Sequence, residues 1–407
     1  MYENRPAKVI RFTESRKFAA NYELRSEVGL LIIYLLLFVV FVMIALLMEL
    51  RLTGNARLAL LIFGYVLLVL FVGLRWETGN DWFSYYNYYK HLPTIAGQFA
   101  SFEPGFKIFN LSLKALKVPF SGFNLIYAAL YLGLMFLSFK RESFEVSGWL
   151  VLQLYSPFIF GLMGTTRQVM AMSICMFSVR YLLSKEWLKF LLCIAAATTF
   201  HISALSFLLA WPLARMKVSQ TRVWVIFAAL VLASLSNFGT IVFNAVQQRV
   251  AILRLVALED RLWQQQESNP EEFRNAAGPM ATAVQTMGRF SLLALFVACL
   301  RFFRQESDQL YLKFYLVSIV IIVLFSGTAY VLAGRVAIYF AIFQIHLLAL
   351  LTRRIPVRWI RGLCCTALVA LSLTRLWTAT HLIRPQIFVP YKGVFINQDV
   401  KRDPGWF

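Results

Sequence analysis

The chain contains few charged residues, and acidic ones are the scarcest. Only 15% of its 407 residues are charged, and 20 Asp and Glu residues are outnumbered by 40 Lys and Arg residues. A typical soluble domain has about 25% charged and about 45–50% apolar residues, whereas 59% of this chain is hydrophobic. These proportions exclude an ordinary soluble enzyme and indicate an integral membrane protein.

Several catalytic motifs are also absent. The chain has no G-x-x-x-x-G-K-[ST], no G-x-S-x-G and no H-E-x-x-H, so a nucleotide-hydrolysing P-loop, a serine-hydrolase elbow and a zinc protease have no sequence support. None of the five cysteines forms a C-x-x-C pair, which leaves no redox or zinc motif. Acidic residues are too sparse within the apolar runs for an evident proton pathway. An activated substrate is therefore the simplest energy source for a reaction.

The apolar residues are gathered in runs close to the length of a membrane-spanning helix. We predict an all-α, polytopic integral membrane helical bundle with about 11–13 hydrophobic segments, some short enough to be re-entrant. The prediction divides the chain into an N-terminal tail over residues 1–27, a transmembrane domain over residues 28–378 with polar outer-face loops at 75–103 and 244–285, and a C-terminal tail over residues 379–407.

Basic residues between the apolar runs predict the orientation. In the last two-thirds of the chain the basic loops can all be cytoplasmic, which leaves the turns at Gly164–Arg167, His201 and Gly334–Arg335 on the outer side. The orientation of the first third of the chain stays open from the sequence, because two signals disagree. Its basic N-terminal tail favours the cytoplasm for loop 75–103, whereas the polar residues of that loop favour the outer face. We prefer the outer face, which requires residues 104–118 to dip without crossing.

Ionisable side chains at the ends of apolar runs are informative, because an arginine near the bilayer centre costs about 2.5–3.5 kcal/mol on insertion scales. Arg167 and Gln168 open an apolar run directly after Gly164-Thr-Thr, and Arg335 follows a glycine in the same way. Helix N-termini attract anions, and two arginines on one side of the membrane suit a diphosphate. The alternatives are snorkelling to lipid headgroups and coincidence.

Further candidates are one histidine and two carboxylates. His201 lies between two apolar halves, where it could act as a general base, as a hydrogen-bond donor or only as a packing residue. The densest polar cluster contains Arg75, Asp81 and Tyr85, and Glu103 follows it. Aromatic rings beside carboxylates suit a sugar, although an interfacial aromatic belt also collects tyrosines. Asp81 with Glu103 would permit catalysis by paired carboxylates.

Short motifs follow one another along residues 58–395. They are R-x-x-x-G-x-D-[WY]-x-x-Y (Arg75 to Tyr85), F-E-P-G-F (Phe102 to Phe106), R-Q-x-x-A (Arg167 to Ala171), F-H-x-S-A (Phe200 to Ala204), G-R-x-x-x-Y-F (Gly334 to Phe340) and P-Y (Pro390 and Tyr391). In this order and spacing they resemble the EpsG family, which is grouped with Wzy-type bacterial polysaccharide polymerases.

The resemblance implies a polymerase at the outer face of the bacterial cytoplasmic (inner) membrane, similar in fold to GT-C-type membrane glycosyltransferases. Its substrate would be oligosaccharide repeat units on undecaprenyl diphosphate, and its other partners would be membrane lipids, a flippase and a chain-length regulator, with no nucleic acid. No cofactor is expected, although Mg²⁺ stays an alternative. The competing interpretations are a lipid-to-acceptor glycosyltransferase or O-antigen ligase, and a flippase or exporter of lipid-linked glycans.

The expected mechanism is displacement at an anomeric carbon with undecaprenyl diphosphate as the leaving group. Arg167 and Arg335 would stabilise the charge that develops on the diphosphate, and Asp81 or His201 would take the proton of the acceptor hydroxyl. The sugar or the diphosphate would be positioned by Arg75, Tyr85, Glu103, Gln168, Tyr391 and Lys392.

Overall fold

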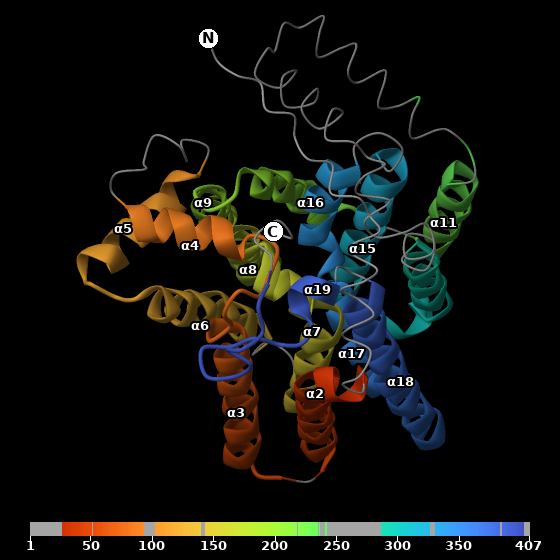
Figure 1. Cartoon of the computed structure of the whole chain (residues 1–407). Helices are drawn as coiled ribbons and strands as arrows, with labels where there is room; N and C mark the ends of the chain where they lie inside the picture. The colour runs from red at the N-terminus through yellow and green to blue at the C-terminus, as the bar shows by residue number, and fades with distance from the viewer. Residues whose placement is uncertain are drawn as a thin grey trace, which may run out of the picture.

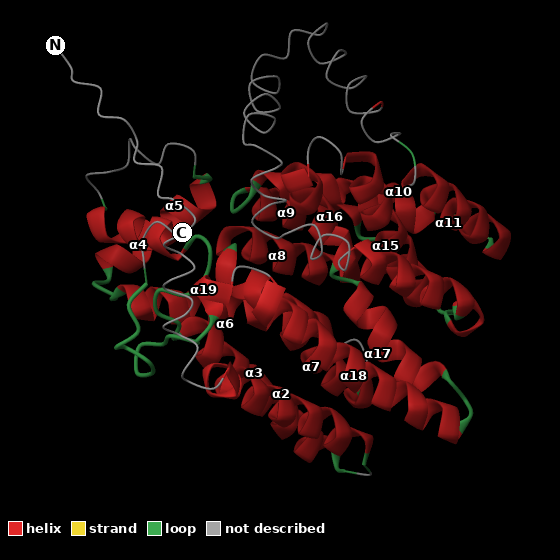
Figure 2. Cartoon of the chain, turned by 45° about the vertical axis from the view of Figure 1, so that its right-hand side comes forward, coloured by secondary structure: helices red, strands yellow, loops and turns green. Residues whose placement is uncertain are grey.

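The protein is all-helical (Figures 1 and 2). This computed structural model describes residues 27–50, 52–92, 102–139, 143–217, 219–234, 236, 241, 286–325, 330–382 and 385–402. Within these ranges the only extended pairing is two isolated β-bridges, one between Arg75 and Gly393 and one between Gly393 and Ile396. The predicted all-α class is confirmed. Most of the predicted N-terminal tail and the predicted loop 244–285 lie outside the described residues.

The helices are named as in Figure 1. In chain order they are α2 (Glu27–Glu49), α3 (Gly54–Gly73), α4 (Trp82–His91), α5 (Pro104–Ala115), α6 (Phe120–Phe139), α7 (Phe144–Gly164), α8 (Thr166–Leu183), α9 (Trp187–Thr198), η1 (Ile202–Leu209, a 3₁₀-helix), α10 (Ala210–Arg215), α11 (Gln220–Ser234), η2 (Leu300–Phe302), α15 (Glu306–Phe325), α16 (Tyr330–Ala341), α17 (Gln344–Arg354), α18 (Arg358–Leu382) and α19 (Pro385–Phe388).

Among the described residues, six helical segments are long and apolar enough to cross a membrane. They are Leu31–Glu49, Gly54–Gly73, Phe120–Phe139, Glu306–Phe325, Ala333–Arg354 and Arg358–His381. Helix α7 is bent by 64° and supplies a seventh if its two halves form one span. The shorter apolar helices are Trp187–Thr198, Ile202–Arg215, Gln220–Ser234 and Thr286–Ala298. A polytopic membrane protein is therefore confirmed, and the short pair predicted around His201 is present.

Helices α7 and α8 form the centre of the bundle. Residues on every face of both helices are buried, as expected of helices surrounded by protein. Helix α2 packs closely on α7 at Gly148, which has no side chain. A Cβ at Gly148 would lie only 3.0 Å from the Cα of Ala45 in α2. Thr165 is the C-cap of α7 and also precedes the first residue of α8, so the end of α7 sets the position of Arg167 in the first turn of α8.

The connections rich in Lys and Arg meet at one end of the bundle, which we call the basic end. Their contacts join Arg353 to Glu145, Arg354 to Asp308, Lys313 to the carbonyl of Met216 and Arg180 to the carbonyl of Leu137. These connections are the ones predicted from the sequence to be cytoplasmic. The structure brings them together, while the side of the membrane on which they lie stays a prediction.

Helices α4 and α5 lie at the opposite end from the turn between α2 and α3 (Figure 1). Helix α5 begins where Gly105 N–H donates to the carbonyl of Thr199 at 2.8 Å, and it is followed by Val118, whose carbonyl accepts from the Tyr89 hydroxyl of α4 at 2.6 Å. Since α6 then runs to the basic end, residues 102–118 start and finish at one end. This is the arrangement that the preferred topology requires of the segment 104–118.

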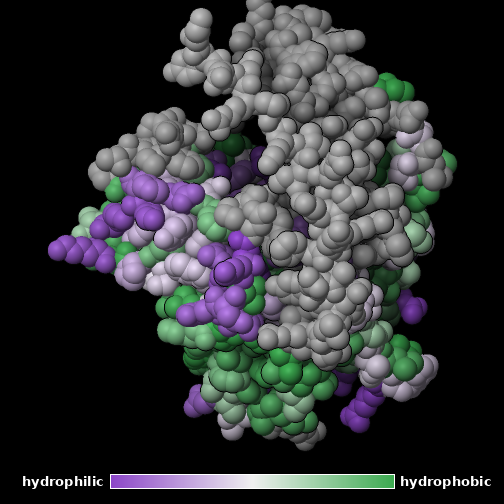
Figure 3. Space-filling model, in the orientation of Figure 1, coloured by the Kyte–Doolittle hydropathy of each residue, from purple (hydrophilic) through white to green (hydrophobic). Residues whose placement is uncertain are grey.

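Surface polarity changes along the bundle. Figure 3 shows hydrophobic residues gathered over α2 and α3, and hydrophilic residues over α4 and the C-terminal segment. On α2 and α3, exposed apolar side chains such as Leu36, Val39, Ile62 and Phe63 are about half accessible. Contiguous exposed apolar surface marks contact with lipid or another apolar partner, so the α2–α3 hairpin presents a lipid-facing side.

Candidate functional site

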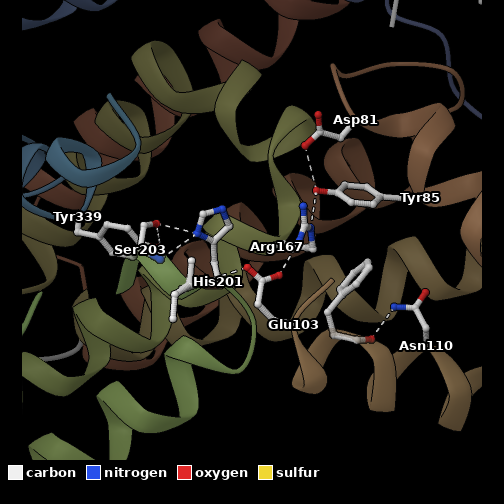
Figure 4. Close-up of polar contacts among 10 residues, drawn as sticks. Asp81, Tyr85, Glu103, Asn110, Arg167, His201, Ser203 and Tyr339 are labelled. Carbon is white, nitrogen blue, oxygen red and sulfur yellow. Dashed lines mark hydrogen bonds and ion pairs between the residues drawn. The ribbon is translucent and has the colours of Figure 1, made fainter. Parts of the chain in front are cut away.

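Segments distant in the chain meet at the end opposite the basic end. Figure 4 shows Asp81, Tyr85, Glu103, Arg167 and His201 close together. They come from the start of α4, the N-terminus of α5, the first turn of α8 and the turn between α9 and η1. Four segments that the sequence predicted separately therefore form one polar site.

Arg167 is the central side chain of the site. Its Nη1 lies 2.5 Å from Glu103 Oε2, and its Nε donates to the Tyr85 hydroxyl at 3.4 Å. The guanidinium also lies over the ring of Phe102, 4.3 Å from the centroid. An ion pair and a cation–π contact together hold a guanidinium in one orientation. Arg167 is thus a fixed cation at a helix N-terminus.

Tyr85 connects Arg167 to Asp81. Its hydroxyl donates to Asp81 Oδ2 at 3.0 Å. Burial and the negative charge of Asp81 raise the pKa of Tyr85, while Arg167 opposes the shift. The hydroxyl therefore stays protonated and continues to donate, which positions the Asp81 carboxylate.

The Glu103 carboxylate is occupied on both oxygens. Oε2 pairs with Arg167, and Oε1 accepts the backbone N–H of Ile202 at 3.2 Å. Ile202 is the first residue of η1, so the carboxylate also lies at the positive end of that helix. Glu103 therefore acts here as an anchor that joins α5, α8 and η1.

His201 has a defined tautomer. Its Nδ1 accepts the backbone N–H of Ser203 at 3.3 Å and lies 2.6 Å from Ser203 Oγ, which is 3.1 Å from the Tyr339 hydroxyl. A backbone N–H can only donate, so Nδ1 carries no proton and the neutral ring carries its proton on Nε2. Of the roles predicted for His201, this geometry favours the hydrogen-bond donor.

The ionisation of His201 predicts a pH-dependent stability. Burial, with Arg167 and Arg335, lowers the pKa of His201 from 6.5 to about 4, against the opposing charge of Glu103. Between about pH 6.5 and pH 4 the unfolded chain binds more protons than the folded chain, so the contribution of His201 to stability is lost as the pH falls through that window. Wild-type protein should therefore lose more thermal stability in detergent than His201→Gln between about pH 7 and about pH 4.5. Equal losses would contradict the lowered pKa.

Arg335 lies at the edge of the same site. Gln168 Nε2 donates to the backbone carbonyl of Arg335 at 2.6 Å, which joins α8 to α16. The Arg335 side chain is exposed and makes no ion pair with any described residue. The charges of Arg335 and Arg167 both lower the pKa of His201. Two arginines thus act on one histidine, while their binding of a diphosphate stays a prediction.

Gly79 allows the loop that carries Asp81 to approach α7. Its φ is +113°, and a Cβ there would overlap the carbonyl oxygen of Met163. We expect Gly79→Ala to displace Asp81, to lower activity and to destabilise the fold by about 1–3 kcal/mol. Gly161→Ala is the matched control, since a Cβ on Gly161 of α7 meets nothing within 4 Å. Equal melting temperatures for the two variants would refute this role.

Three of the predicted substrate-binding residues form a cluster that neighbours the site around Arg167. Arg75 is only 2% exposed, and Arg75 and Tyr391 each donate to a backbone carbonyl of α3 at 2.6 Å. Lys392 Nζ lies 2.5 Å from Glu77 Oε2. These contacts fasten the C-terminal segment to the loop after α3. Contact of these three residues with substrate stays a prediction.

Two positioning residues were missed from the sequence. Ser203 sets the tautomer of His201, and the spacing F-H-x-S at a helix start was the signal available for it. Arg402 is buried and donates to the Thr78 hydroxyl at 3.1 Å and to several backbone carbonyls, which closes the C-terminal segment over the loop before Asp81. Nothing in the sequence around Arg402 distinguishes it from other basic residues in a tail.

The described residues contain no cluster of three or more His, Cys, Asp or Glu side chains that could hold a metal ion. The pair kept as an alternative for Mg²⁺ is Asp81 and Glu103. Within the site, Glu103 binds Arg167 and the backbone N–H of Ile202, and Asp81 accepts the Tyr85 hydroxyl. The observed contacts give these two carboxylates separate partners.

A family model matches most of the chain. The model of the EpsG family matches residues 58–392, which begin within α3 and end at Lys392. No curated protein and no solved structure matches the chain. The similarity to GT-C-type folds implied by the motifs therefore stays a prediction. The matched region contains every residue of the site around Arg167.

Proposed function

This chain belongs to the EpsG family of Wzy-type polysaccharide polymerases, and on that premise we propose that it polymerises oligosaccharide repeat units carried on undecaprenyl diphosphate. The product would be a surface polysaccharide such as O-antigen, capsule or exopolysaccharide. Basic loops usually remain in the cytoplasm, so the basic end is cytoplasmic and the site around Arg167 faces the outer side of the bacterial cytoplasmic membrane.

One observation carries the proposal. A fixed arginine at a helix N-terminus, a second arginine, a neutral histidine and two carboxylates meet with aromatic rings at the end of the bundle away from the basic loops. Cationic and N–H donors are the groups that stabilise a departing diphosphate. Aromatic rings with carboxylates suit sugar hydroxyls and ring faces. The same site therefore serves both halves of a lipid-linked glycan.

In the proposed reaction, a hydroxyl at the non-reducing end of a new repeat unit attacks the anomeric carbon of the growing chain. The new C–O bond forms as the bond to undecaprenyl diphosphate breaks, and the diphosphate leaves with the bonding electrons. Arg167, Arg335 and His201 Nε2–H stabilise its charge. The proton of the acceptor hydroxyl passes to a base at the site.

Asp81 is the residue best placed to be that base. Glu103 has Arg167 on one oxygen and Ile202 N–H on the other, and His201 has its Nδ1 engaged by the backbone of Ser203. Asp81 is oriented by the Tyr85 hydroxyl. Of the two candidate bases predicted from the sequence, Asp81 and His201, we therefore propose Asp81.

The test is a glycan gel on purified protein supplied with undecaprenyl diphosphate-linked repeat units extracted from the producing strain. We expect a ladder of products of increasing length. A single added unit would indicate a lipid-to-acceptor transferase or ligase. Movement of intact lipid-linked units across proteoliposomes with no new glycosidic bond would indicate a flippase or exporter.

A further inference from the structure

The hairpin formed by α9 with η1 and α10 has two apolar faces. Its inward face contains Phe190, Ile194 and Phe207, which are buried, and the ring centroids of Phe190 and Phe207 lie 6.3 Å apart. Its outward face contains Leu188 and Leu192, which are more than half exposed. An element that is apolar on every side is stable only where its outer surface also avoids water. The outward face therefore contacts hydrocarbon.

An apolar groove of about 380 Å³ lies on this hairpin near the basic end. Volumes of this order accommodate part of a small apolar ligand. Among the residues that line the groove, the Arg215 guanidinium lies 4.4 Å from the ring centroid of Trp211. The lining residues come from both arms of the hairpin and are Trp187, Leu191, Leu208, Trp211, Pro212 and Arg215.

A strip of exposed apolar side chains connects this groove to the site. Ile202, Leu205 and Leu208 are 45%, 47% and 38% exposed. They are spaced by three residues in a 3₁₀-helix, which has three residues per turn, so they share one face. At about 2.0 Å per residue the strip runs about 12 Å from Ile202 to Leu208. Its upper end is the residue whose N–H binds Glu103, and its lower end lines the groove.

We propose that this strip and groove bind the polyprenyl tail of the lipid-linked substrate. The proposal rests on the proposed function, which places the diphosphate at Arg167 and Arg335. From there a tail can follow Ile202, Leu205 and Leu208 into the groove without leaving apolar surface. The acyl chains of a phospholipid would not begin at the site, because nothing in the proposed function holds a phospholipid headgroup there. The continuity of the strip with the site therefore selects the polyprenyl chain.

The first test fills the groove with Leu208→Trp. KM is measured for repeat units on undecaprenyl diphosphate and on geranyl diphosphate, whose tail is too short to reach Leu208. We expect KM for the long-tailed substrate to rise about tenfold, with KM for the short-tailed substrate unchanged. Leu209→Trp is the matched control, because Leu209 is also exposed on η1 but does not line the groove. Equal changes of KM on both tails would overturn the proposal.

The second test does not depend on activity. Undecaprenyl diphosphate with a diazirine on about the third or fourth isoprene unit from the diphosphate, which matches the length of the strip of about 12 Å, should label peptides within residues 187–215 of the wild type, and the Leu208→Trp variant should lose that label. Labelling elsewhere, or equal labelling by a diazirine phosphatidylglycerol that undecaprenyl diphosphate does not displace, would overturn the tail site. Labelling at 187–215 without any ladder from authentic substrate would instead contradict polymerisation and leave the tail site standing.

Discussion

Arg167→Ala is expected to lower kcat/KM for chain extension by about 100- to 1,000-fold, the loss typical of removing one donor to a developing charge. The arginine is held by Glu103, Tyr85 and the ring of Phe102, so it stabilises the transition state without reorganising. The measurement is the rate of ladder growth at equal amounts of folded protein. Arg167→Lys should lose most of this effect too, because an ammonium group lacks the planar fork that binds phosphate oxygens.

A matched control exists on the same helix. Arg180 lies near the other end of α8, stacked 3.8 Å over the ring of Phe177 and bonded to the carbonyl of Leu137 at the basic end. Arg180→Ala removes the same charge from the same helix and should leave kcat/KM nearly unchanged. If both substitutions lowered the rate equally, loss of charge or of α8 packing would explain the effect, and no diphosphate clamp would be needed.

A double-mutant cycle separates the clamp from the anchor. If Arg167 acted only by holding Glu103, Glu103→Gln would cost as much as Arg167→Ala, and the double variant would be no worse than either. If Arg167 binds the diphosphate, Arg167→Ala should be much the more damaging of the two single variants. Removing the arginine also leaves Glu103 without its ion-pair partner, so stability is measured in parallel and the rate is referred to folded protein.

Much of this fold can be predicted from hydrophobicity alone. Apolar runs near 20 residues report spanning helices because lipid forces every backbone polar group to pair within the helix. The short runs on each side of His201 likewise predict a turn at membrane depth, and the basic loops that share an end follow the charge rule. These features depend on single segments and their solvent, so no knowledge of partners is required.

Side-chain partners within the bundle could not be predicted in the same way. Glu103 and Arg167 are separated by 64 residues, and neighbouring helices in a membrane are chosen by packing and hydrogen bonding, with no polar pattern to mark the shared face. The motif that contains Arg75 predicts a substrate ligand, but it did not predict that the Arg75 guanidinium is buried against the end of α3; contact of Arg75 with substrate stays a prediction. A charged side chain in an apolar run predicts that the residue has a partner, but the identity of that partner is seen only in the folded structure.

Asp81→Asn is expected to lower kcat by about 10²–10⁴-fold with little change in KM. Asparagine keeps the size of the side chain and an oxygen that accepts the Tyr85 hydroxyl, so binding and loop position should persist while the base is lost. Tyr85→Phe is the companion variant, since it keeps the ring but removes the donor that orients Asp81. Its effect should be smaller than that of Asp81→Asn, because the carboxylate remains.

The pH profile distinguishes Asp81 from His201 as the base. The base must be unprotonated, so kcat/KM of the wild type should fall on acidification with one ionisation. That ionisation should disappear in Asp81→Asn. It should persist in His201→Gln, because burial and two arginines already keep the imidazole neutral and its Nδ1 is engaged by Ser203. If instead the acid limb vanished in His201→Gln and survived in Asp81→Asn, the imidazole would be the base. Its proton would then have to sit on Nδ1 or be shared, which the Ser203 backbone N–H does not permit without movement of the turn.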